Sequence, residues 1–163
     1  MQLTIRLVPD ADRHAYRAML DDPAIARMTM TLKCPISVEE ADARRLDTST
    51  GDVASLFRGG LYDGETLVGE VGTFENAGGF HEIGYLIGRQ YWGCGYASAA
   101  VPLIIAAIRD GGYKGVIEAG VYHDNPASLQ VLRKNGFVIT GDSDVFCRER
   151  GCMVAGVMLR LGG

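Results

Sequence analysis

The stretch "RQYWGCGYASAA", from Arg89 to Ala100, decides the fold and carries the strongest functional signal in the sequence. Gly93 and Gly95 lie two residues apart in it, between an apolar run and a segment of small residues. The first N–H groups of a helix have no partner inside the helix and carry a partial positive charge. Glycines just before them let an anion come close to the main chain. The stretch predicts a phosphate-binding turn, and the alternative is that both glycines only permit a tight strand-to-helix turn.

The segments on either side of this turn predict a strand, a helix and a second strand. "FHEIGYLI" (80–87) precedes it, and "YASAAVPLIIAAIRD" (96–110) is typical of a buried helix that ends at Gly111-Gly112. Pro102 inside this helix is expected to kink it or open it locally. "KGVIEAGVY" (114–122) then resumes a strand. This order implies a parallel pair of strands joined by a right-handed crossover.

The N-terminal half adds hairpins and helices to this unit. "LTIRLV" (3–8) alternates like a half-buried strand and a helix follows it, while Ser37 and Glu40 form a capping-box pattern before a helix over about 38–47. "ASLFRGGLY" (54–62) and "TLVGEVGTF" (66–74) predict strands joined by the hairpin dipeptide Asp63-Gly64. Antiparallel pairing is therefore expected next to the parallel pair.

The C-terminal part contains one more helix and two strands. "NPASLQVLRKNGF" (125–137) predicts a helix with Asn125 as N-cap, Pro126 in its first turn and Gly136 after its end. "FVIT" (137–140) and "CMVAGVMLRL" (152–161) are expected to close the chain as strands. The whole chain, 1–163, is thus predicted to form one domain with a mixed sheet and helices packed on it.

Composition narrows the classes of partner and compartment. The net charge is -4, with 16 Lys+Arg scattered among 20 Asp+Glu, which argues against nucleic acid as the main partner. No stretch is long enough to span a membrane and no signal-peptide core begins the chain. The four cysteines form no CxxC pair and the three histidines are dispersed. We therefore expect a reduced, cytoplasmic protein that binds no metal.

The segment "QYWGCGYA", with Gln90, Gly93 and Gly95, resembles the Q/R-x-x-G-x-G/A signature of the GNAT superfamily of N-acetyltransferases. The resemblance runs from about Thr66 to Thr140 and includes the Asn-containing helix that ends in Gly-Phe. Ser128, three residues after Asn125, is similar to the ribosomal-protein N-terminal acetyltransferase branch (RimJ/RimL-like).

This resemblance implies the acyl-CoA N-acyltransferase fold, a mixed α/β structure with a mostly antiparallel sheet whose central parallel strands splay apart. Acetyl-CoA is the implied cosubstrate, with its pyrophosphate on the amides from Gln90 to Ala97 and its pantetheine along the strand at Leu86 and Ile87. The expected binding residues are Leu86, Ile87, Arg89, Gln90, Gly93, Cys94, Gly95, Tyr96, Ala97, Asn125 and Ser128.

Two residues are candidates for proton transfer. Glu82 lies where several members of the superfamily carry a general base, although it is alternatively a solvent-facing strand carboxylate, since His81 and Glu82 point to opposite faces. Ser128 is the candidate that hydrogen-bonds or protonates the CoA sulfur, because the tyrosine of many relatives is Leu132 here. The alternative for Ser128 is a local backbone contact in the first helical turn. Cys94 is expected to be a bystander, as the family transfers acyl groups directly.

The sequence therefore leads to an N-acetyltransferase whose acceptor, a peptide N-terminal amine or a small amine, attacks acetyl-CoA directly in a ternary complex. A catalytically silent CoA-binding sensor or interaction module remains the alternative, motivated by the missing tyrosine. A dinucleotide-binding enzyme is disfavoured, because Ser98 stands where that fingerprint requires Gly or Ala. The acceptor pocket is expected from the N-terminal helices and the loops 48–55 and 74–79. A homodimer is compatible with the family, but nothing in the sequence specifies an interface.

Overall fold

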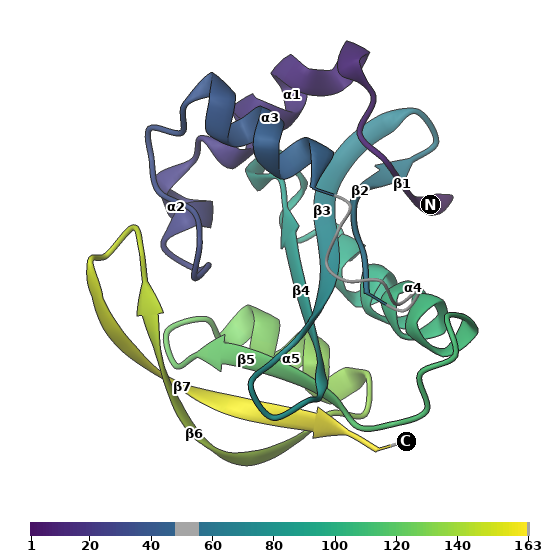
Figure 1. Cartoon of the computed structure of the whole chain (residues 1–163), viewed down its shortest axis with the longest axis vertical. Helices are drawn as coiled ribbons and strands as arrows, with labels where there is room; N and C mark the ends of the chain where they lie inside the picture. Colours follow the sequence, from purple (N-terminus) through teal and green to yellow (C-terminus); the bar gives the residue numbers. More distant parts are fainter. Residues whose placement is uncertain (48–55, 163) are drawn as a thin grey trace.

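A computed structural model describes residues 1–47 and 56–162. Its centre is one mixed sheet in the order β1-β2-β3-β4-β5-β7-β6 (Figure 1). The strands are β1 (Leu3–Arg6), β2 (Arg58–Asp63), β3 (Thr66–Glu75), β4 (His81–Ile87), β5 (Ile117–Tyr122), β6 (Val138–Cys147) and β7 (Cys152–Leu161).

The parallel pair at the centre of the sheet is β4 and β5, and every other neighbouring pair is antiparallel. The helix α4 (Tyr96–Asp110) connects the two parallel strands, as predicted. Their pairing consists only of His81 with Ile117 and Glu82 with Glu118 in the described part of the chain. Beyond these pairs the strands diverge, so that β1–β4 and β5–β7 form two halves of a split sheet (Figure 1).

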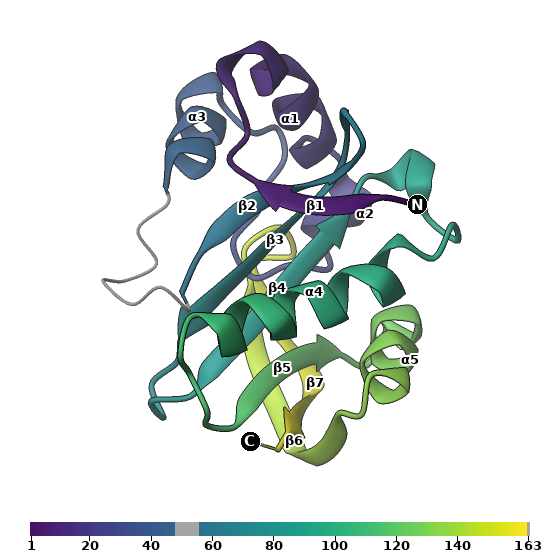
Figure 2. The ribbon, with the colours of Figure 1, turned by 90° about the vertical axis from the view of Figure 1, so that its right-hand side faces the viewer.

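Helices cover both faces of the sheet. Figure 2 shows α4 crossing one face, with α5 (Pro126–Lys134) at its side and α1 (Arg13–Leu20) and α3 (Val38–Leu46) at the far end. Two short elements, α2 (Pro23–Ala26) and a 3-10 turn over Asp10–Asp12, complete the N-terminal part. Side chains alternate along β4: Ile83 and Ile87 enter the core beneath α4, while Leu86 packs with the N-terminal helices. One face of β4 therefore packs against α4, and the other packs against the N-terminal helices.

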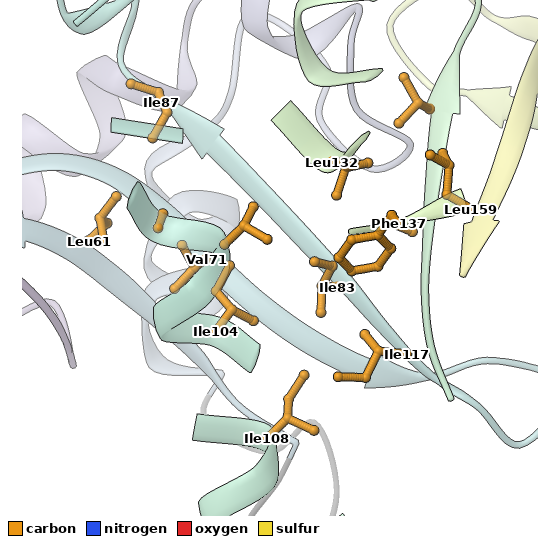
Figure 3. Close-up of a cluster of buried hydrophobic side chains, with 14 of the residues drawn as sticks. Leu61, Val71, Ile83, Ile87, Ile104, Ile108, Ile117, Leu132, Phe137 and Leu159 are labelled. Carbon is orange, nitrogen blue, oxygen red and sulfur yellow. The ribbon is translucent and has the colours of Figure 1, made fainter. Parts of the chain in front are cut away.

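The main core joins both halves of the sheet to α4 and α5. Its buried side chains come from β2, β3, β4, α4, β5, α5 and β7 and converge in one layer (Figure 3). Ile104 and Ile108 of α4 are completely buried there, and Leu132 of α5 is 1% exposed. Packing thus holds the two halves together where main-chain hydrogen bonds between β4 and β5 are missing.

Several local expectations need correction. The hairpin loop between β2 and β3 is Gly64-Glu65, since Asp63 still pairs with Thr66. Ser37 accepts a hydrogen bond from the Glu40 amide at 3.0 Å, but the Glu40 side chain pairs with Arg148 and does not complete the capping box.

Two further boundaries differ from the sequence prediction. β6 extends to Cys147, well beyond the predicted 137–140, because its partner β7 continues the pairing as far as Cys152. The predicted strand 54–62 begins only at Arg58, and residues 54 and 55 lie outside the described part. α4 continues through Pro102 as one helix.

Candidate active site

The turn before α4 has the main-chain conformation that its glycines permit. Gly93 has φ 76° and Gly95 has φ 84°, values that favour glycine. A Cβ on either residue would point into open space, with no heavy atom within 4 Å. Gly95 is the N-cap of α4 and supplies no side chain to the first turn. The turn therefore presents bare main chain to any ligand that approaches it.

The amides of this turn divide into two groups. Three of them donate to carbonyls of the turn itself, namely those of Tyr91, Trp92 and Cys94. Within the described residues, no protein acceptor is found for six others, those of Gln90, Gly93, Gly95, Tyr96, Ala97 and Ser98. The amides of Tyr91 and Trp92 are taken up by the 3-10 turn Arg89–Tyr91 and that of Cys94 by the Tyr91 carbonyl, so only part of the predicted stretch from Gln90 to Ala97 is open to a ligand. The available donors are concentrated at the first turn of α4, where the helix dipole is positive.

Aromatic side chains brace the turn. The rings of Tyr91 and Tyr96 pack edge to face with centroids 5.8 Å apart, and the Tyr96 hydroxyl donates to Asp63 at 2.9 Å. The Trp92 indole, 49% exposed, donates to the Ile87 carbonyl oxygen at 2.7 Å. Gln90 and Cys94 are exposed, and so is Arg89, which forms an ion pair with Asp22 at 3.7 Å. Of the expected binding residues, Ile87 thus already uses its carbonyl oxygen within the protein.

A cavity of about 300 Å³ lies where β4 and β5 diverge. Its lining includes Glu82, Gly84 and Leu86 from one face of β4, and Ile83 and Tyr85 from the other. Because neighbouring residues of a strand point to opposite faces, residues from both faces of β4 border this cavity at the opening in the sheet. The cavity continues to Asn125, Ser128 and Leu132 near α5, and its outer wall includes Met28, Thr29, Met30, Thr31, Ser143 and Val145. Glu82 and Ser128, the two residues predicted to transfer protons, therefore line the same cavity.

Glu82 lies in this cavity beside Asn76 and Gly120. The Asn76 amide donates to its carboxylate at 3.5 Å, and the same amide donates to Glu118. Burial raises the pKa of the Glu82 carboxyl above its ordinary value and the charge of Glu118 adds to this, whereas the Asn76 hydrogen bond acts in the opposite direction. His81 points the other way and stacks on Tyr113 with centroids 3.6 Å apart. The solvent-facing alternative for Glu82 does not describe this geometry.

Ser128 meets a hydroxyl that the sequence did not predict. The Asn125 side chain caps α5 by accepting the Ser128 amide at 3.2 Å, as expected for an N-cap. The Ser128 hydroxyl oxygen lies 2.8 Å from the Tyr85 hydroxyl oxygen across the opening between β4 and α5. Burial raises the pKa of Tyr85 to about 12, so its phenol is protonated at neutral pH. Leu132 is buried in the core and offers no hydroxyl.

A buried ion pair closes the N-terminal side of the cavity. The Arg44 guanidinium donates to both carboxylate oxygens of Glu70, with Nη2 2.6 Å from Oε1, and Tyr16 donates to the same carboxylate. Glu70 is 5% exposed, and this fixed pair ties α3 to β3. The sequence carried no signal for the pair, because its members are 26 residues apart on elements of different type. The expected contribution from the loop 48–55 lies outside the described residues.

A family model for the acetyltransferase (GNAT) domain matches residues 2–138. The chain belongs to the GNAT acetyltransferase family. This membership agrees with the split sheet, the bare turn before α4 and the cavity beside the opening between β4 and β5. A comparison with curated protein sequences finds no match.

Solved structures share the fold of this GNAT domain at low sequence identity. A GNAT-family acetyltransferase from Bacillus anthracis has a TM-score of 0.80 at 17% identity, covering 99% of this chain and 95% of that one. The spermidine N-acetyltransferase from Vibrio cholerae, in complex with CoA and spermine, has a TM-score of 0.76 at 20% identity, covering 97% and 94%. The yncA protein from Salmonella typhimurium, solved with acetyl-CoA, has a TM-score of 0.75 at 18% identity, covering 99% and 94%.

The described part of the GNAT domain contains neither a membrane-spanning helix nor a metal-binding cluster. Among the described residues, no helix is long and apolar enough to cross a membrane. Over the same ranges, 1–47 and 56–162, no group of three His, Cys, Asp or Glu side chains is arranged to hold a metal ion. The four cysteines are all unpaired thiols, and Cys147 and Cys152 face each other across the β6–β7 hairpin without a disulfide.

Proposed function

We propose that this GNAT domain transfers an acetyl group from acetyl-CoA to a primary amine by direct attack in a ternary complex. The observation that carries the proposal is the cavity at the opening of the split sheet, which joins the Glu82 carboxylate to the Ser128 and Tyr85 hydroxyls. An amine that loses a proton and a thiolate that gains one need groups of these two kinds on opposite sides of the reacting carbon. The cavity supplies both in one space.

The turn before α4 fits the diphosphate of a coenzyme A. Gly93 and Gly95 leave room for it, because the space next to both is open: a Cβ on either would meet no heavy atom within 4 Å. The available amides at the start of α4 suit an anion through hydrogen bonds and the helix dipole. The β4 edge at Leu86 lies beside the opening of the sheet and is the proposed place for the pantetheine. When bound, acetyl-CoA supplies the thioester that the amine attacks.

Glu82 is proposed as the base that takes the proton of the amine at its carboxylate. Its raised pKa makes the carboxylate a better proton acceptor than an ordinary surface glutamate. Asn76 holds the carboxylate in place by a hydrogen bond. Positioning of the two reactants is expected to contribute more to the rate than proton transfer itself.

Ser128 and Tyr85 are proposed as the pair that provides the proton for the departing thiolate. Ser128 stands at the start of α5 and reaches the opening, and Tyr85 lies behind it as a neutral phenol. A proton that leaves the Ser128 Oγ is replaced from the Tyr85 hydroxyl at 2.8 Å. The alternative of a catalytically silent CoA-binding module was based on the absence of a tyrosine at position 132. The Tyr85 phenol can supply the missing hydroxyl, so this reason no longer applies.

The acceptor is proposed to be either a peptide N-terminus or a small amine. The position of Ser128, three residues after Asn125, resembles the pattern of the ribosomal-protein N-terminal acetyltransferases. This resemblance supports a peptide N-terminus as the acceptor. The spermidine N-acetyltransferase shares the fold, and its complex contains spermine, which supports a small amine. Both classes present a primary amine that a cavity of this size admits.

The test is thiol release from acetyl-CoA with N-terminal peptides, amino acids, polyamines and aminoglycosides as acceptors. We expect Glu82→Gln to lower kcat/KM by roughly 10²–10⁴-fold on the best acceptor. Ser128→Ala and Tyr85→Phe should each lower it by at least about tenfold, and the double variant by less than the product of the two, since one pair acts as a unit.

Glu75→Gln is the matched control, because Glu75 is an exposed carboxylate at the end of β3 and lies outside the cavity lining. It should keep the wild-type rate. Unchanged turnover in Glu82→Gln and in both hydroxyl variants would contradict the assigned roles. Absence of acetyl transfer to every acceptor, together with absence of stabilisation by CoA, would contradict the proposed function itself.

A further inference from the structure

One face of the sheet carries a row of residues that the proposed chemistry does not use. Arg58 on β2 pairs with Gly72 on β3, and Gly72 pairs with Gly84 on β4. Because side chains alternate along strands, this row lies on the same face as Glu82, two residues from Gly84. Arg58, Gly72, Gly84 and Glu82 all line the cavity. The two glycines leave the floor between the arginine and the glutamate bare.

Arg58 differs from the other charged residues of the cavity in lacking a partner. Arg44 and Glu70 neutralise each other in a bidentate ion pair. Arg58 is half-buried, and within residues 1–47 and 56–162 it forms no hydrogen bond and no ion pair. A half-buried guanidinium has five N–H donors that are stabilised by an anion of planar or tetrahedral shape. Among the described residues that line the cavity, Arg58 is therefore a cation without an ion pair at one end of the bare floor, and Glu82 is a carboxylate at the other end.

The spacing of these two groups limits what lies between them. Strand spacing and rise per residue place the Cα atoms of Arg58 and Glu82 roughly 12 Å apart. Both side chains rise from the same face over the two glycines, so the gap between their charged ends is that of a small molecule. A second ammonium group in this space would lie near Arg58 and be repelled, whereas a carboxylate or another oxyanion would be attracted.

We infer that the acceptor is a primary amine that also carries an anionic group, such as an amino acid or a short acidic peptide, with the anion held by Arg58 and the amine directed to Glu82. This inference rests on the proposed function and specifies its acceptor. In the reaction the amine nitrogen forms a bond to the acetyl carbon, the bond from that carbon to sulfur breaks, Glu82 takes the amine proton, and the thiolate is protonated. The anionic group takes no part in these bonds. It binds and orients the acceptor.

The experiment uses matched acceptors that differ only in the anion. Thiol release from acetyl-CoA is measured with the L-amino acids and acidic dipeptides as free acids, with the corresponding amides, and with spermidine. Wild type is compared with Arg58→Gln and Arg58→Lys, and Arg6→Gln serves as the control, because Arg6 lies on the edge strand β1 outside the cavity lining. Thermal unfolding is followed for each variant, and Arg58→Gln should unfold close to wild type, since it breaks no hydrogen bond and no ion pair among the described residues.

We expect wild type to prefer an acid over its amide by roughly 10–100-fold in kcat/KM, as for a hydrogen bond to a charged group. Arg58→Gln should remove this preference, mainly through a higher KM, and leave the amides unaffected. Arg58→Lys should keep part of it, because the charge remains but the bidentate geometry is lost.

Two other results would overturn the inference. Amides or spermidine acetylated faster than any acid, at rates that Arg58→Gln leaves unchanged, would refute it while the proposed function stands. If no amine of any kind is acetylated and acetyl-CoA does not stabilise the protein, the proposed function fails and the inference fails with it.

Discussion

At the scale of single residues, Glu82, the proposed base, is a carboxylate that the fold holds in a cavity at some expense of stability. Its carboxylate is drawn into a cavity beside Glu118, and burial raises its pKa. The Asn76 amide is shared between both carboxylates, while Glu118 also accepts from Arg160 at 2.6 Å. The better-paired Glu118 is thus the structural carboxylate, and Glu82 is left with the weaker contact.

Replacement of Glu82 by Gln should therefore stabilise the fold at neutral pH while it removes activity. A carboxyl whose pKa is raised in the folded state favours folding at low pH, and this contribution is lost as pH rises through the folded pKa. We expect Glu82→Gln to melt at a higher temperature than wild type at pH 7–8 and to lose this advantage below about pH 4, the range of an unfolded Glu. Thermal unfolding between pH 3.5 and 8 measures it. A variant that melts lower than wild type at pH 8 would contradict the expected burial effect.

Single residues also show the limit of reading the sequence. Ser128 and Glu82 could be proposed because each lies at a fixed spacing from a recognisable motif. Tyr85 could not, since its contact with Ser128 spans 43 residues and forms only after α4 has brought β4 and α5 together. Arg58 was missed for the same reason: its cross-strand partner is Gly72, which pairs in turn with Gly84, and these glycines carry no pattern of their own.

At the scale of elements, α4 has a left-handed glycine near each end. Gly95 (φ 84°) precedes its first turn, and Gly112 (φ 95°) follows its last turn. Neither would bring a Cβ within 4 Å of another heavy atom. A substitution at either position would strain the backbone in the same way. The difference is that the amides next to Gly95 are the proposed binding site of a diphosphate.

Alanine at these two positions should separate folding from binding. Each substitution places a side chain in the left-handed region, at a free energy of about 1–2 kcal/mol, so both variants should melt roughly 2–8 °C below wild type. Gly95→Ala should also weaken CoA binding by about tenfold or more, as expected for the loss of a hydrogen bond to a charged group. Gly112→Ala should bind CoA like wild type. Calorimetric titration of both with CoA decides it, and equal affinities would mean that the turn holds no phosphate.

Elements were predicted well where a cap or a turn residue marked their ends. Asn125, Pro126 and Gly136 mark α5 at the predicted positions, since a helix end is decided by local main-chain chemistry. The strand predicted over 137–140 was too short, because the length of β6 depends on pairing with β7 and its exposed residues show no clear alternation. The capping box was half right: the Glu40 side chain found a cation in a distant hairpin instead.

At the scale of the whole molecule, the sheet is two halves joined mainly by side-chain packing. The strands β4 and β5 pair at only two positions in the described part, and the core beneath α4 makes up the rest of the connection. The mixed sheet, its central parallel pair and the crossover could be predicted from the resemblance and the turn. The degree of opening could not, since it results from the competition between pairing and packing along one pair of strands.

A ligand that lies between the halves should stabilise them as one unit. CoA at a hundred times its dissociation constant should add about 2.7 kcal/mol, a rise in melting temperature of roughly 5–11 °C. Amide hydrogen exchange should slow along Ile83–Ile87 of β4, while the outer hairpin of β6 and β7 should change little. Stabilisation by CoA without protection of β4 would place the coenzyme elsewhere than the opening.

The bare floor of the cavity has a consequence for how the acceptor preference of this protein can evolve. Gly84 has an ordinary backbone conformation, and a methyl group on it would meet no protein atom within 4 Å. An alanine at this position would reduce the space for the acceptor and would displace no protein atom. The stability of the fold would therefore stay the same. The preference for one acceptor over another can therefore change through single-nucleotide mutations while the fold is unchanged.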